Sequence, residues 1–254
     1  GSSAPSGSFK PSGGFVSGSL AGDQILVCPD NRRFRQYNTA GSGNNCGIHS
    51  VFGQNHGGTY MAPDADQIRG QLIRVLEVLK ADLDTSMLNY DNSLYQDIWA
   101  LAIEAINARR HTNYGIAELG EEILDDYIAE IRRGSMLQLQ ELQILAMINK
   151  TKIVCVSKGH GGGLIEHSDH YPLQGDWIGA LGLREDLSWR NLRGQTVYIY
   201  NGGDGYARGS YQGVHFSHAE LIADGAFGTA MSLPTKIAYG QSISRDVIYY
   251  VPTE

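Results

Sequence analysis

The spacing of apolar residues changes near residue 150, and this change constrains the fold more than any other feature of the sequence. Before it, apolar side chains recur every three or four residues, which is the period of an amphipathic helix. After it, they form short continuous or alternating runs rich in β-branched residues, which are typical of strands. Because helices come first and strands mostly later, without regular alternation, the sequence predicts an α+β fold.

Four helices are predicted between residues 64 and 149, each from one apolar stripe. Asp64 or Asp66 suits the start of the first helix, and Ser93 suits the N-cap of the second. The third should end at Gly134. The stripes consist of Ile68, Leu72, Val75, Leu76 and Leu79; Leu94, Ile98, Leu101, Ala102 and Ala105; Ile116, Leu119, Ile123, Tyr127 and Ile131; and Leu139, Leu142, Leu145 and Ala146.

Short strands are predicted on both sides of this helical region. Residues 25–28 form an apolar run that ends at a Pro-Asp-Asn turn. Residues 152–157 form a continuous β-branched run, typical of a strand covered on both faces, and residues 195–200 alternate aliphatic residues with Tyr and Thr. Further strands are expected at residues 214–216 and 246–251.

The two ends of the chain differ in composition. Residues 1–22 are dominated by Gly, Ser and Pro, and the opening Gly1-Ser2 is typical of a cloning remnant, so we expect a flexible lead-in. Residues 23–254 are then expected to form a single catalytic domain with a helical lobe at about residues 62–134.

Charge and cysteine content narrow the classes of function. The formal net charge of −7 argues against a nucleic-acid partner, although Arg32, Arg33 and Arg35 could form a local basic patch. No apolar run approaches the roughly 20 residues that cross a bilayer, and no retained signal peptide is evident. Three cysteines without a CxxC pair, and with a single isolated CxxH spacing at Cys46 and His49, predict neither a disulfide framework nor a zinc site, which fits a reducing, cytoplasmic compartment.

Cys46 is the candidate nucleophile. It follows the loop Gly-Ser-Gly-Asn-Asn and opens an apolar segment where a helix should begin. A helix N-terminus favours thiolate over thiol, and its free N–H groups can receive an oxyanion. The alternative is that Cys46 is a small buried apolar side chain, which is the interpretation favoured for Cys155 inside its strand; Cys28 has no supporting pattern.

A cysteine nucleophile needs a histidine that is close in space, and His215 is the candidate. It lies between two apolar residues on the expected late strand, beyond a glycine-rich loop. The alternative is an ordinary strand histidine, and His218 is a second candidate for the base or for orienting it. His49 is too close to Cys46 in sequence to face it, and the pair His167 and His170 is better explained by a polar surface loop than by a metal site.

Three segments, in order, resemble the OTU (ovarian tumour) family of cysteine proteases. Residues 43–50, Gly-Asn-Asn-Cys-Gly-Ile-His-Ser, are similar to the family's Asp-Gly-Asn-Cys motif. Residues 133–146, followed by the strand at 153–156, are similar to its Glu-Leu-x-x-Leu-Ala helix and strand. Residues 214–216, Val-His-Phe, resemble its terminal His-aromatic motif. Together the segments cover about a third of the chain and imply a papain-like OTU fold with a central mixed sheet flanked by helices.

This resemblance implies a deubiquitinase that hydrolyses isopeptide bonds after the C-terminal glycine of ubiquitin, without a metal or organic cofactor. Cys46 would be the nucleophile and His215 the base, with Gly43, Asn44 and Asn45 around the oxyanion. The family often has Asp at the position of Gly43 and Asp or Asn at that of Ser217. Ser217 is therefore one candidate for orienting the base, beside Asp30, Asn44 and Asn201.

The enlarged helical region resembles that of divergent bacterial OTU effectors, in which inserted helices help to hold ubiquitin, and it implies action in a host cytosol. Glycine-rich stretches at 159–163 and 202–213 are candidates for the walls of a channel that threads the ubiquitin tail, or are ordinary loops. Candidate contacts to ubiquitin are Met61, Met87, Leu88 and Tyr90.

Two other functions remain open at this stage. One is a papain-like peptidase, amidase or acyltransferase with a different substrate, and the other is a ubiquitin-binding module that has lost catalysis.

Overall fold

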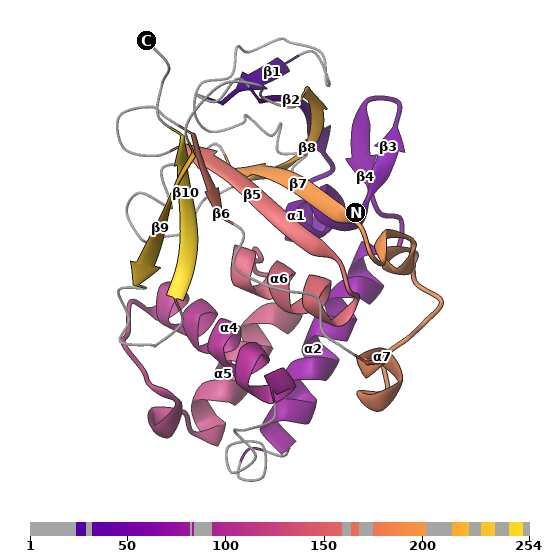
Figure 1. Ribbon diagram of the computed structural model, residues 1–254. Coiled ribbons are helices and arrows are strands. Elements are labelled where there is room, and N and C mark those ends of the chain that lie inside the picture. The colour runs from indigo at the N-terminus through magenta and orange to yellow at the C-terminus, as the bar shows by residue number, and fades with distance from the viewer. Residues whose placement is uncertain are drawn as a thin grey trace.

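The computed structural model describes residues 24–28, 32–81, 83, 93–158, 164–167, 175–201, 215–223, 230–236 and 244–250. Within them the chain is mixed α+β, with a mixed sheet flanked by helices, as the order of apolar patterns predicted (Figure 1). Several features named from the sequence lie outside the described residues: the lead-in 1–22, the stretches 159–163 and 202–213, and the residues Asp30, Met87, Leu88, Tyr90, His170 and Val214.

Ten strands of the described part form one sheet, in which only the β2–β4 and β5–β7 pairs are parallel. β1 (Gln24–Val27) pairs with β2 beside the main path. Along that path the order is β3 (Gln54–His56), β4 (Thr59–Met61), β2 (Arg33–Thr39), β8 (Phe216–Ala223), β7 (Thr196–Asn201), β5 (Lys152–Lys158), β6 (Leu164–His167), β10 (Ser244–Tyr250) and β9 (Ala230–Lys236).

The longer helices gather on one side of the strands, where α1 lies against β7 and β8 and α6 lies under β5 (Figure 1). Short 3-10 turns connect several of them. The helices are α1 (Cys46–Phe52), α2 (Ala65–Ala81), α4 (Ser93–Arg110), α5 (Glu121–Arg132), α6 (Leu139–Ile148) and α7 (Trp177–Ala180); the 3-10 turns are η1 (Ser42–Asn44), η2 (Ile116–Glu118) and η3 (Ser188–Leu192).

The core follows the predicted apolar stripes. All five stripe residues of α2 are at most 1% exposed, and those of α6 are fully buried. The main core joins the helices to one face of the sheet, and a smaller cluster covers the other face. Successive side chains of β5 point to opposite faces of the sheet, so Cys155 packs in the main core and Val156 in the smaller cluster.

One predicted helix is shorter than expected. The stripe from Ile116 to Ile131 is divided between η2 and α5, because the backbone is extended at Leu119 and Gly120. The carboxylate of Glu118 accepts a hydrogen bond from the Gly115 N–H at 3.1 Å and so closes the short turn on itself. The helix ends near Gly134 as predicted, where the left-handed φ of 89° favours glycine.

The strands are only partly as predicted. β1, β5, β7 and β10 match the expected runs, whereas β2 and the β3–β4 hairpin were not foreseen. β2 lies inside the sheet, between β4 and β8, so part of the sheet is formed before the helical region, although β5 to β10 follow it. Its inward positions include the polar Gln36, which hides the alternation of apolar residues. His215 immediately precedes β8 and does not lie within it.

No helix in the described part of the chain is both long and apolar enough to span a membrane.

Candidate active site

Cys46 is the first residue of α1, at the position expected for a nucleophile. The loop before it contains two left-handed residues in succession, Gly43 with φ 67° and Asn44 with φ 57°. This conformation suits glycine and asparagine better than other residues, which explains the turn-forming sequence there. The chain thus turns abruptly into the helix, and Cys46 is only 2% exposed.

The environment of the sulfur combines opposing effects on the thiol pKa. Burial is the largest and raises the pKa of Cys46. Backbone hydrogen bonds from Phe216 and Gly47 lower it, as does the positive charge of Arg69. The amides at the helix N-terminus thus act in the expected direction, but desolvation outweighs them and the net direction is upward.

The hydrogen bond from Phe216 places the start of β8 at the sulfur of Cys46. His215 is the chain neighbour of Phe216, so the structure brings together the two segments that supply the predicted nucleophile and base. His215 is 7% exposed, and burial lowers its pKa to about 4. Its imidazole is therefore neutral near pH 7, which is the form that can accept a proton.

The candidates for orienting the base have different surroundings. The Ser217 hydroxyl accepts a hydrogen bond from Nε2 of Gln36 at 2.9 Å, and Ser217 is buried. Asn201, also buried, ends β7 directly opposite Phe216 in the strand register. The side chain of Asn44 is committed elsewhere, because its amide donates to the Gly134 carbonyl at 2.8 Å.

Two other histidines near α1, His49 and His218, form hydrogen bonds with backbone groups. Nδ1 of His49 accepts a hydrogen bond from the Ala62 N–H at 2.9 Å. Nδ1 of His218 donates to the Ser50 carbonyl at 2.8 Å, and its ring stacks on Tyr60 with the centroids 3.6 Å apart. Burial lowers the pKa of both, to about 4 for His218. These contacts indicate structural roles for the two side chains.

The predicted oxyanion residues are tied to the scaffold. The Asn45 N–H donates to the Ser42 carbonyl at 3.3 Å, and the carbonyls of Gly43 and Asn44 accept hydrogen bonds from Arg69. The N–H groups that point to the sulfur belong instead to Cys46, Gly47 and Phe216. All three amides lower the pKa of the thiol.

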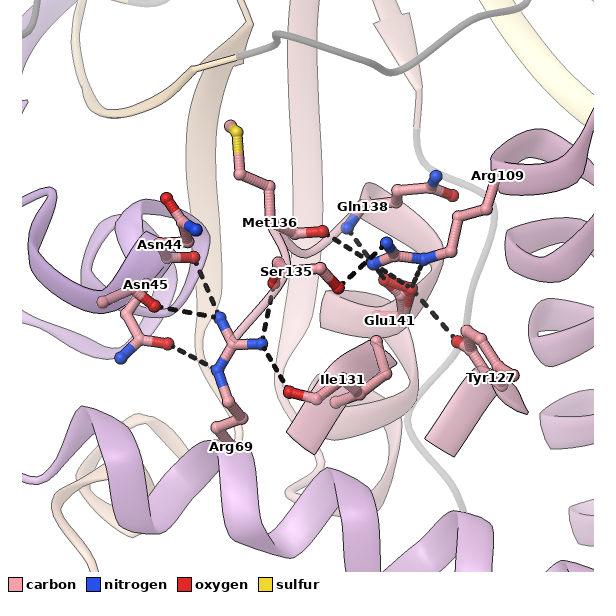
Figure 2. Close-up of polar contacts among 11 residues, drawn as sticks. Asn44, Asn45, Arg69, Arg109, Tyr127, Ile131, Ser135, Met136, Gln138 and Glu141 are labelled. Atoms are coloured by element: carbon pink, nitrogen blue, oxygen red, sulfur yellow. Dashed lines mark hydrogen bonds and ion pairs between the residues drawn. The ribbon is translucent and has the colours of Figure 1, made fainter. Parts of the chain in front are cut away.

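A network that the sequence did not reveal lies behind the loop (Figure 2). Arg69 of α2 is 6% exposed, and Nε donates to the side-chain oxygen of Asn45 at 2.8 Å. Its Nη1 donates to the carbonyls of Ile131 and Ser135. Asp66, one turn earlier on α2, accepts from the Asn45 amide at 2.8 Å. An arginine beside the apolar stripe of a helix is usually exposed to solvent. The spacing of apolar residues therefore did not predict that Arg69 is buried and bonded to the loop.

A second buried arginine braces the neighbouring segment (Figure 2). Arg109 of α4 pairs with the carboxylate of Glu141 at 2.5 Å, and Glu141 is fully buried. The hydroxyl of Tyr127 also donates to Glu141, at 3.1 Å, while Arg109 donates to the Met136 carbonyl at 2.6 Å. These bonds fix the turn between α5 and α6, which Arg69 connects to the cysteine loop.

A cavity of about 530 Å³ lies between the β3–β4 hairpin and the strands β7 and β8. Tyr60, His218 and Glu220 line it, but Cys46 and His215 do not. We place the candidate site at Cys46 despite this cavity, because the chemistry of the thiol and imidazole lies there. Within the described ranges, no three His, Cys, Asp or Glu side chains gather in a way that could hold a metal ion.

Comparison of the chain with family models, with curated proteins and with solved structures found no match.

Proposed function

We propose that this chain is a cysteine-dependent deubiquitinase with a papain-like OTU fold, in which Cys46 is the nucleophile and His215 the base. The observation that carries the proposal is the hydrogen bond from the Phe216 N–H to the Cys46 sulfur. It joins two motifs that are far apart in sequence and that resemble the family's cysteine and histidine motifs. The packing of α1 against β7 and β8 in a mixed sheet supports the same fold.

The pKa directions favour a neutral thiol and a neutral imidazole before substrate binds. Proton transfer from Cys46 to His215 therefore accompanies attack of the sulfur on the isopeptide carbonyl. In this mechanism the amides of Cys46 and Gly47 at the helix N-terminus would stabilise the tetrahedral oxyanion that forms. His215 then protonates the departing lysine amine, and water hydrolyses the thioester to release ubiquitin and restore the thiol.

The test is reaction with a ubiquitin probe that carries a C-terminal electrophile. Wild type should gain the mass of one ubiquitin, Cys46→Ala should gain none, and His215→Ala should react far more slowly. Cys155→Ala is the matched cysteine control, because Cys155 is equally buried but lies in the sheet. His218→Gln is the matched histidine control and should react like wild type. A folded wild type that ignores both the probe and polyubiquitin would exclude the deubiquitinase.

One observation favours a second function, a ubiquitin-binding module without catalysis. Both Cys46 and His215 are almost completely buried, whereas a nucleophile must meet a carbonyl carbon. This alternative predicts that ubiquitin binds, that the probe does not react, and that Cys46→Ala leaves the affinity unchanged. A papain-like peptidase, amidase or acyltransferase would instead show thiol-dependent turnover that ignores ubiquitin.

A further inference from the structure

We propose that Arg69 is a positioning residue for Cys46, whose guanidinium holds the loop that carries the nucleophile in its reactive conformation. This inference rests on the proposed function, since it assigns Arg69 a part in the same acyl transfer. Arg69 does not act as a proton donor or nucleophile; it acts through the loop (Figure 2).

The guanidinium joins two segments that are otherwise separate in the chain. Toward the loop it donates to the Asn45 side-chain oxygen at 2.8 Å and to the Asn44 carbonyl at 3.0 Å. Toward the turn between α5 and α6 it donates to the carbonyls of Ser135 at 2.8 Å and Ile131 at 3.2 Å. All three of its nitrogens are used, so the side chain is held from both sides.

These bonds set the orientation of two peptide planes in the loop before Cys46, those of the Gly43 and Asn44 carbonyls. A peptide group is planar, so a carbonyl held toward Arg69 turns the N–H of the same group the opposite way. The carbonyl of Asn44 is held in this manner, and the left-handed φ of Asn44 is less favourable for a non-glycine residue than a helical or extended one. Loss of the guanidinium would therefore release the loop toward more common conformations.

Arg69 donates its hydrogen bonds to neutral acceptors. In the described part of the chain, Arg69 forms no ion pair with a carboxylate, and its hydrogen-bond acceptors are carbonyl and amide oxygens. Glu141 and Asp66 act on this charge without bonding to it, and Arg109 opposes them. Arg69 is among the groups that lower the pKa of the Cys46 thiol. The same charge would favour the sulfur anion as it forms.

Lysine cannot reproduce this geometry. An ammonium group supplies the charge as a compact point, whereas the planar guanidinium directs several donors at acceptors on opposite sides. Arg69→Lys therefore separates the contribution of charge from that of loop geometry, and Arg69→Met removes both.

The experiment measures thiol titration and turnover on Arg69→Lys and Arg69→Met. Ultraviolet absorbance of the thiolate is recorded against pH, and the signal of Cys46→Ser is subtracted to remove Cys28 and Cys155. We expect Arg69→Met to raise the thiol pKa by about one unit and to lower kcat about 100-fold with little change in KM. Arg69→Lys should titrate close to wild type but remain about tenfold slower.

Arg109→Lys is the matched control, because the Arg109 side chain is only 10% exposed and braces the same turn without touching the cysteine loop. It should lower the melting temperature but leave the thiol titration unchanged. If the Arg69 variants have the thiol titration and the kcat of wild type, the inference is overturned. If wild type does not hydrolyse ubiquitin, the proposed function fails, while the inference is decided by the rate at which iodoacetamide alkylates Cys46 per thiolate: a slower reaction in both Arg69→Lys and Arg69→Met supports it, and wild-type rates overturn it.

Discussion

A Cβ atom on Gly47 would lie 2.8 Å from Cδ1 of Leu142, closer than such atoms approach in proteins. Helix α1 therefore rests on α6 at a distance that only glycine allows. Since Gly47 directly follows Cys46, this contact sets the depth at which the candidate nucleophile lies in the protein. The same contact explains why a glycine follows the cysteine in a position where glycine weakens a helix.

Gly47→Ala should destabilise the protein by about 1–3 kcal/mol, because the added methyl overpacks the contact with Leu142. Denaturant unfolding followed by circular dichroism measures the change. Gly70→Ala is the matched control, since a Cβ there meets nothing within 4 Å on α2. It should stabilise by about 0.5–1 kcal/mol through helix propensity. Equal stability of Gly47→Ala and wild type would show that α1 and α6 can separate without cost.

Glu141→Gln should cost about 3–5 kcal/mol, because it leaves the buried Arg109 guanidinium without its counter-charge. The carboxylate also accepts from the Gln138 N–H at 3.1 Å, a contact that the amide would keep only in one orientation. Glu77→Gln is the control, because Glu77 pairs with Arg132 at the surface with side chains 43% and 58% exposed. It should change the unfolding free energy by less than about 1 kcal/mol. Similar costs for both variants would contradict a special role of the buried pair.

The helical half of the fold was predictable because its apolar residues repeat at the helical period and face one core. The stripe of α2 is an example, and both it and α6 came out as expected. The strand β2 was not predictable, because its inward positions include Gln36 and one of its pairing partners, β8, lies far along the chain, as in the bond to Ser217 with a separation of 181. Alternation fails as a signal when a buried position is polar.

The candidate site, like the fold, was only partly predictable from the sequence. Cys46 could be chosen from a local pattern, a turn-rich loop that opens an apolar segment. The roles of Arg69 and Glu141 could not, since both are charged residues on helices, where exposure is the usual expectation. Only the fold reveals that the carbonyls of two distant turns converge on Arg69. The pKa direction of Cys46 was missed for a related reason: burial is a property of the whole fold, whereas the helix N-terminus is local.

Ser217→Ala should cost about 1 kcal/mol of stability, because the amide of Gln36 loses its acceptor in a buried place between β2 and β8. If Ser217 mainly joins these strands, probe reactivity per folded molecule should fall less than about threefold, against near-complete loss in His215→Ala. The matched variant is Asn201→Ala, the other buried candidate beside Phe216. A loss of reactivity in one of them comparable to that of His215→Ala would identify the residue that orients the base.

His218 makes stability depend on pH in a direction that can be worked out. Burial lowers its folded-state pKa to about 4 and outweighs the Ser50 carbonyl and Glu220, which raise it; the ordinary value is 6.5. Between these values the unfolded chain binds a proton that the folded protein does not, so stability falls as pH drops below about 6.5. Above that pH the histidine is neutral in both states, so it no longer makes the free energy of unfolding depend on pH.

At about pH 5 this single group should lower the unfolding free energy by about 2 kcal/mol relative to pH 7. Urea unfolding of wild type and His218→Gln at both pH values isolates the effect. The variant loses the stack on Tyr60 and is less stable throughout, but its decrease from pH 7 to about 5 should be smaller than that of wild type by the same 2 kcal/mol. His49 and His215 remain in both proteins, so their contributions cancel. Parallel pH curves would mean that His218 keeps an ordinary pKa in the folded protein and that water reaches its ring.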